Sequence, residues 1–72
     1  MKNLPENIKA IRCKKGVQQK DLANMIGVKP SMICQVETGI RLPSLAMLFN
    51  MAKVLNCSLD ELTGFNEFRK ED

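Results

Sequence analysis

Twenty residues near the middle of the chain, Gln19 to Thr38, restrict the fold more than any other segment. Apolar residues recur at helical spacing up to Ile26, and Gly27 follows them immediately. A second short helix is expected to begin at Pro30, since proline is favoured in the first helical position, where its missing N–H would be unpaired anyway. Two helices this short, joined by so tight a turn, cannot lie antiparallel and must cross steeply.

Capping residues and apolar repeats place five helices along the chain. Asn3 with Glu6, and Ser58 with Glu61, have the spacing of capping boxes, and Ser44 is a third candidate cap. The expected helices cover residues 4–15, 19–25, 30–37, 45–55 and, from the Ser58 cap, 59–62. The chain is therefore predicted to be all-α, with one domain over residues 1–64 and a polar tail over residues 65–72. A chain of 72 residues has room for one modest core and not for a second module.

The apolar stripes of these helices predict a single core. Its expected members are Leu4, Ile8, Ile11, Leu22, Ile26, Val28, Ile33, Val36, Leu45, Leu48, Ala52, Leu55, Leu59 and Leu62. Ala23 and Gly27 are small where two helices must approach closely, so a larger residue at either position is expected to overpack the crossing at a cost of about 1–3 kcal/mol. Gly27 also tolerates the left-handed backbone conformation that a sharp turn demands.

Charge is divided unevenly between the two parts of the chain. Residues 1–41 hold eight Lys/Arg and three Asp/Glu, a net charge of +5, whereas residues 42–72 hold three and five, a net charge of −2. The positive charge therefore lies in the same part of the chain as the two crossing helices, where it could bind phosphate groups of a partner. Solvated basic faces are common, so this asymmetry alone does not identify a partner.

Three cysteines and the absence of histidine argue against metal chemistry. Cys13, Cys34 and Cys57 are an odd number without a C-x-x-C pair, which favours neither a zinc site nor a disulfide framework. We expect reduced thiols, with Cys57 half-buried, and no cofactor. The alternative is that Cys34, on the second helix of the pair, is a redox switch, although the sequence does not establish the cationic setting that a reactive thiolate needs. No apolar run is long enough to span a bilayer and no secretory signal pattern is present, so the expected location is the cytoplasm.

Residues from about Ile8 to Leu62 resemble the Cro/repressor-type (XRE) helix-turn-helix family of bacterial and phage regulators. The matching landmarks are Ile8, Ile11-Arg12, Leu22-Ala23, Gly27-Val28, Ile33, Glu37-Thr38-Gly39, Pro43-Ser44 and Ser58-Leu59-Asp60-Glu61-Leu62. The resemblance implies a compact five-helix, lambda-repressor-like DNA-binding domain that inserts its second helix-turn-helix segment, about residues 30 to 37, in the major groove. Family members usually carry Ser or Thr caps where Gln18 and Lys29 stand, so we expect those two helix starts to be looser or shifted by a residue.

The same resemblance implies a structural ion pair between Arg12 and Glu37, beneath the second helix of the pair. A guanidinium can hold a carboxylate through two parallel hydrogen bonds. The alternative is that the two residues are independent surface charges. If the pair is buried, removing one partner is expected to cost about 3–5 kcal/mol.

The candidate DNA contacts follow from which side of the second helix faces the core. Ile33 and Val36 are expected to face inward, which leaves the opposite side for the groove. The base-reading candidates are Pro30, Ser31, Met32 and Gln35, and the phosphate-contact candidates are Gln19, Lys29, Thr38, Ile40 and Arg41. Gln35 is the strongest reader, because its amide can donate and accept together at adenine N7 and N6.

The predicted function is therefore sequence-specific DNA binding by a transcriptional regulator. One domain offers little contact area, so a homodimer on an inverted repeat is expected, with half-sites about 34 Å apart. The candidate dimer surface is the end of the fourth helix, the fifth helix and Phe65 and Phe68 of the tail.

Repression is favoured over activation because a bound protein blocks polymerase simply by occupying its site. A protein-interaction or antitoxin-like adaptor that keeps the fold is the main alternative, and an enzyme is disfavoured because no nucleophile–base arrangement or Gly-rich phosphate loop is present.

Overall fold

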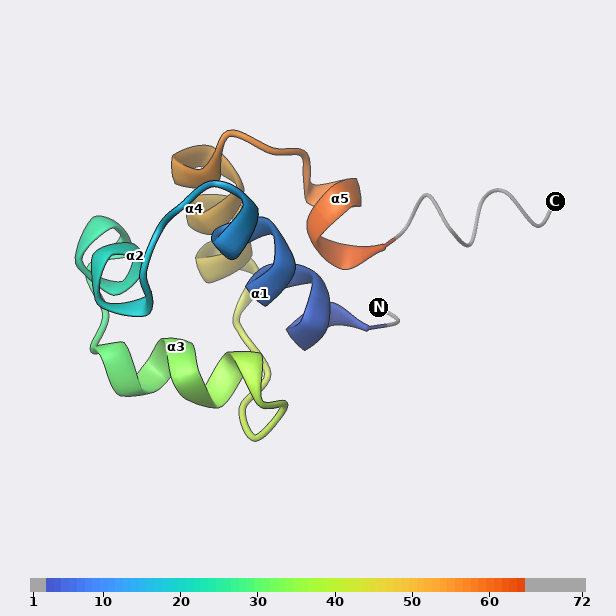
Figure 1. Cartoon of the computed structure of the whole chain (residues 1–72). Coiled ribbons are helices and arrows are strands. Elements are labelled where there is room, and N and C mark those ends of the chain that lie inside the picture. The colour runs from blue at the N-terminus through green and yellow to red at the C-terminus, as the bar shows by residue number, and fades with distance from the viewer. Residues whose placement is uncertain (1–2, 65–72) are drawn as a thin grey trace, which may run out of the picture.

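The computed structural model describes residues 3–64, which form five α-helices and no strand (Figure 1). The helices are α1 (Leu4–Lys14), α2 (Gln19–Ile26), α3 (Pro30–Glu37), α4 (Leu45–Leu55) and α5 (Leu59–Thr63). α2 packs on α3 and α4, while α1 lies against α3 and α5. The predicted all-helical, five-helix arrangement is confirmed. None of the helices in this part of the chain has the length and apolar character needed to cross a bilayer.

Two of the expected helix caps are present. The Ser58 side chain accepts a hydrogen bond from the Glu61 N–H at 3.0 Å, and the Glu61 carboxylate accepts one from the Ser58 N–H at 2.9 Å, which completes the predicted capping box. Ser44 Oγ accepts from the Met47 N–H at 3.1 Å and so caps α4. Both caps satisfy backbone donors that a helix start leaves open.

The starts of α2 and α3 lack such caps. Gln18 and Lys29 occupy the N-cap positions with extended backbones, and neither side chain makes a capping hydrogen bond. The helices nevertheless begin at the next residue, so the expected shift does not occur. α2 ends at Ile26, one residue later than predicted, with Gly27 in the left-handed region at φ 75°.

The capping box predicted for α1 is wrong. Asn3 adopts a left-handed backbone at φ 60°, and its side chain makes no capping hydrogen bond. A capping side chain needs the extended backbone of the usual N-cap to reach the amide three residues ahead. α1 begins instead with Pro5 in its first turn, where a missing N–H costs nothing, and it ends at Lys14, one residue earlier than predicted.

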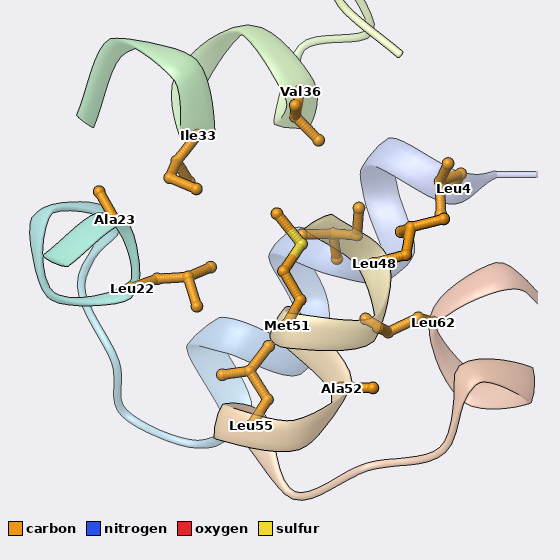
Figure 2. Packing of buried hydrophobic residues seen from close by; sticks show 11 residues of the cluster. Leu4, Leu22, Ala23, Ile33, Val36, Leu48, Met51, Ala52, Leu55 and Leu62 are labelled. Atoms are coloured by element: carbon orange, nitrogen blue, oxygen red, sulfur yellow. The ribbon is translucent and has the colours of Figure 1, made fainter. Parts of the chain in front are cut away.

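The core lies between α4 and the other helices. Figure 2 shows Ile33 and Val36 pointing from α3 into the cluster, with Met51 of α4 near its centre. The buried apolar residues are Leu4, Ile8, Leu22, Ala23, Ile33, Val36, Leu48, Met51, Ala52, Leu55 and Leu62, and Ile11, Ile26, Val28 and Leu59 pack against them while half-buried. Ten of the eleven buried residues agree with the sequence prediction, nine from the helical spacing and Ala23 from the expected close crossing.

Two assignments in the core need correction. Leu45 was expected inside but is 64% exposed, whereas Met51 is fully buried and was not predicted. α4 carries apolar residues on every side, so its spacing does not reveal which side faces inward. Gly27 also differs from expectation, because a Cβ there would meet nothing within 4 Å. Its glycine is required by the positive φ and not by a close helix crossing.

Candidate nucleic-acid interface

α3 divides into a buried side and an exposed side. Ile33 and Val36 are at most 1% exposed, whereas Ser31 and Cys34 face solvent. Of the other base-reading candidates, Pro30 is exposed, and Met32 and Gln35 are partly buried. In Figure 1, α3 runs along one edge of the molecule with no helix beyond it. The exposed side is therefore accessible along the whole helix.

The structure brings Arg12 of α1 and Glu37 of α3 together. Arg12 Nε donates to Glu37 Oε2 at 2.6 Å and Arg12 Nη2 donates to Glu37 Oε1 at 3.0 Å, which is a two-point guanidinium–carboxylate pair. Arg12 Nη1 donates further to the Val17 carbonyl at 2.7 Å. The side chains of Arg12 and Glu37 are 9% and 2% exposed, and the hydrogen bond to Glu37 raises the pKa of Arg12 above its ordinary value. The pair thus fixes the C-terminal end of α3 against α1.

Gln19 adds a third member to this network. Its Nε2 donates to Glu37 Oε1 at 3.0 Å, which joins the start of α2 to the end of α3. One side-chain N–H of Gln19 is consequently engaged inside the protein. Its backbone N–H lies in the first turn of α2 and has no hydrogen-bond partner within residues 3–64, so it can donate to an anion.

The turn after α3 uses most of its own donors. The N–H groups of Ile40 and Arg41 both donate to the Gln35 carbonyl, at 2.9 and 3.1 Å. The Thr38 hydroxyl donates to the carbonyls of Cys34 and Gln35, and the Thr38 N–H donates to Cys34 as well. Among the phosphate candidates of this turn, Arg41 alone keeps unengaged donors in its side chain.

Two cations flank the exposed side of α3. Lys29 stands at its N-cap position and is exposed, and its side chain makes no hydrogen bond or ion pair with any residue from 3 to 64. Arg41, also exposed, donates through Nε to the side-chain oxygen of Gln35 at 3.1 Å, and neither of its Nη groups has a hydrogen-bond partner within residues 3–64. A polar surface between two cations suits a phosphate-bearing partner.

Sequence reasoning placed these residues on the correct elements but missed the bonds between their side chains. Gln19 and Arg41 are both predicted phosphate contacts, and in the structure the Gln19 side chain also donates to Glu37 and the Arg41 side chain also donates to Gln35. A spacing pattern carries no signal for either bond, because an amide on a helix surface can point in many directions. Within the described residues, no group of three or more His, Cys, Asp or Glu side chains is placed to hold a metal. The cysteines are unpaired thiols, and Cys57 is half-buried as predicted.

Comparison with known proteins gives consistent matches over most of the chain. The helix-turn-helix family profile matches residues 8–62. The HTH-type transcriptional regulator YazB of Bacillus subtilis is 44% identical over 55 residues, which cover 76% of this chain and 80% of YazB. The crystal structure of the restriction-modification controller protein C.AhdI from Aeromonas hydrophila superimposes with a TM-score of 0.79 at 30% identity, over 83% of this chain and 91% of C.AhdI.

A second solved structure carries DNA. The P22 c2 repressor in complex with a synthetic operator has a TM-score of 0.76 at 36% identity, over 82% of this chain and 89% of the repressor. The profile match covers the crossing of α2 and α3 and both members of the Arg12–Glu37 pair. The chain belongs to the Cro/repressor-type (XRE) helix-turn-helix family of transcriptional regulators.

Proposed function

We propose that the chain binds specific double-stranded DNA by inserting α3 in the major groove, and that it acts as a repressor. The observation that carries the proposal is the division of α3 into a packed side and an exposed side of short polar residues flanked by Lys29 and Arg41. A helix held from behind by Ile33 and Val36 can present its outer side chains to base edges without moving. The complex of the P22 c2 repressor with its operator supports the same use of this fold.

The proposed contacts fall into two classes. Pro30, Ser31, Met32 and Gln35 project from the first two turns of α3 and are the proposed base readers. Lys29, the Nη groups of Arg41 and the open backbone N–H of Gln19 are the proposed phosphate donors. The Thr38 hydroxyl and the Ile40 N–H donate to carbonyls of residues 34 and 35. Each can bind phosphate only by giving up that internal hydrogen bond and donating to a phosphate oxygen.

The test is selection of bound duplexes from a random pool at near-physiological salt. The proposal expects an enriched motif, and it expects Lys29→Ala to weaken binding to cognate and scrambled DNA alike. Gln35→Ala is expected to lose about 1–3 kcal/mol at one base position only. Failure of the wild-type protein to enrich any sequence would refute specific binding, and equal losses on both DNAs for Gln35→Ala would refute its role as a reader.

We propose further that two copies bind DNA together, in the cytoplasm. The enriched motif is then an inverted repeat with half-sites about 34 Å apart. The proposed dimer surface includes the end of α4, where Val54 is 36% exposed, together with α5. The proposed contribution of Phe65 and Phe68 lies outside the described residues. A protein that stays monomeric by light scattering, both alone at high micromolar concentration and on its motif, would contradict the dimer.

The second candidate function is a protein-interaction or antitoxin-like adaptor. The exposed side of α3 carries no acidic residue before the buried Glu37, which favours DNA over this alternative. Retention on heparin provides a direct comparison. Steep loss of retention with salt supports DNA binding, since each contact between a protein cation and an anionic group of the polymer releases counterions and adds to the slope, whereas absence of retention favours a protein partner.

A further inference from the structure

We propose that Arg41 determines which base Gln35 reads, and that the preferred base is guanine. This inference rests on the proposed DNA binding and adds the basis of its specificity. Gln35 alone would favour adenine, which offers one acceptor and one donor to a side-chain amide. In the structure, the side-chain amide of Gln35 is bonded to Arg41.

Backbone hydrogen bonds hold Arg41 beside Gln35, independently of the Arg41 side chain. The Gln35 carbonyl accepts hydrogen bonds from the N–H groups of Ile40 and Arg41 at 2.9 and 3.1 Å, so the chain turns back against the last turn of α3. The Thr38 hydroxyl reaches the same carbonyl at 3.2 Å. These bonds fix the position of the Arg41 backbone, so the Arg41 side chain lies next to the exposed side of α3.

The side-chain bond between the two residues sets the orientation of the amide. Arg41 Nε donates to Gln35 Oε1 at 3.1 Å. A guanidinium carries donors and no acceptor, so only the oxygen of the amide can face it. Gln35 Nε2, with its two N–H groups, is the part of the amide that remains without a partner within residues 3–64.

An amide held in this way is a donor toward the groove. Guanine presents two acceptors, N7 and O6, on its major-groove edge, and both N–H groups of Nε2 can be directed at them. Adenine presents N7 beside the N6 amino group, and an amino group that approached the second lone pair of Oε1 would also approach the guanidinium cation. The neighbouring positive charge therefore penalises adenine and favours the more negative guanine edge.

The first test needs no DNA. The Arg41 Nε–Hε resonance in an NMR spectrum is expected to exchange with water more slowly in the wild-type protein than in Gln35→Ala, because the acceptor is lost in the variant. Lys29→Ala is the matched control, since it removes the other flanking cation and leaves the Gln35–Arg41 bond in place. Equal exchange in the wild type and Gln35→Ala would overturn the proposal whatever the DNA preference.

The second test reads the base. Duplex selection is carried out with the wild type, Gln35→Ala, Arg41→Ala and the double variant, and the position read by Gln35 is the one whose preference Gln35→Ala removes. We expect at least about fivefold enrichment of guanine over adenine there for the wild type, and a shift toward adenine for Arg41→Ala. In the Gln35→Ala background, Arg41→Ala is expected to cause no further change at this position, because Arg41 acts through Gln35.

The outcomes separate this proposal from the proposed function. Enrichment of a motif with adenine at the Gln35 position, or an unchanged preference in Arg41→Ala, overturns the role of Arg41 and leaves specific DNA binding intact. If Arg41→Ala enriches no duplex at this salt, because the phosphate contact proposed for its Nη groups is lost, the selection is repeated at lower salt, and the absence of a shift toward adenine there overturns the role of Arg41. No enrichment by the wild type refutes the proposed function and this proposal together.

Discussion

Replacing Glu37 with glutamine is expected to remove a large part of the stability of the domain. The carboxylate accepts two hydrogen bonds from Arg12 and one from Gln19 while only 2% of its side chain is exposed. Glutamine has nearly the same shape, but its NH₂ group would face an N–H donor, and Arg12 would keep its charge without a counter-ion. Removing one partner of a buried pair costs about 3–5 kcal/mol.

That loss is large against the whole free energy of unfolding. Domains are stabilised by roughly 0.05–0.15 kcal/mol per residue, which gives about 4–11 kcal/mol for a chain of 72 residues. With a urea dependence of roughly 1–2 kcal/mol per molar for a protein this small, the midpoint of unfolding is expected to fall by about 1.5 M or more. Glu6→Gln makes the same chemical change at an exposed position of α1 and is expected to stay within about 0.5 kcal/mol of the wild type.

Urea titration followed by circular dichroism measures both variants. A loss of less than about 1 kcal/mol in Glu37→Gln would refute the reasoning, because the network would then contribute no more than an exposed pair. A double-mutant cycle with Arg12→Met and Glu37→Met supplies the coupling. The double variant is expected to lose less than the two single variants together, since neither charge is left unpaired, whereas additive losses would contradict direct pairing.

Three further predictions concern single positions. Gln18→Ser is expected to raise the free energy of unfolding by about 0.5–2 kcal/mol, because it supplies the missing cap of α2, and an unchanged melting temperature would argue against an open helix start. The pKa of Glu61 is lowered from its ordinary value of 4.5 by hydrogen bonds from Ser58, so its contribution to stability is present above that value and is lost as the pH falls through the lower folded-state pKa. The difference in melting temperature between the wild type and Glu61→Gln should therefore shrink from about pH 6 to about pH 3, and a constant difference would contradict the sign. Burial raises the pKa of Cys57, so mass spectrometry should find it alkylated by iodoacetamide more slowly than the exposed Cys34 at neutral pH, and equal rates would contradict its half-buried position.

The sequence predicted the helices well because their ends carry local signals. Ser58 with Glu61, Gly27 and Pro30 each determine the backbone within a few residues, and the structure follows all three. Leu45 was misplaced because α4 is apolar on every side, so that its orientation depends on contacts with other helices. Periodicity within a single helix contains no information about those contacts.

The site was predicted only in part for a similar reason. The residues of α3 that face solvent follow from the positions of Ile33 and Val36, which helical geometry fixes. The bond from Gln19 to Glu37 and the bond from Arg41 to Gln35 depend on side-chain rotamers and on how the turn after α3 folds back. Those are properties of the packed structure and have no signature in the spacing of the residues.

The division of α3 also separates two kinds of mutational freedom. The buried side of α3 provides the core packing of Ile33 and Val36 and the ion pair of Glu37. Substitutions at these three positions therefore lower the free energy of unfolding. Ser31 and Cys34 contact solvent and add nothing to the core, so they can be exchanged while the scaffold persists. A lineage of such proteins can therefore acquire a different surface chemistry along one helix without first becoming unstable, and Gln35 is the position where a change would need a matching change at Arg41.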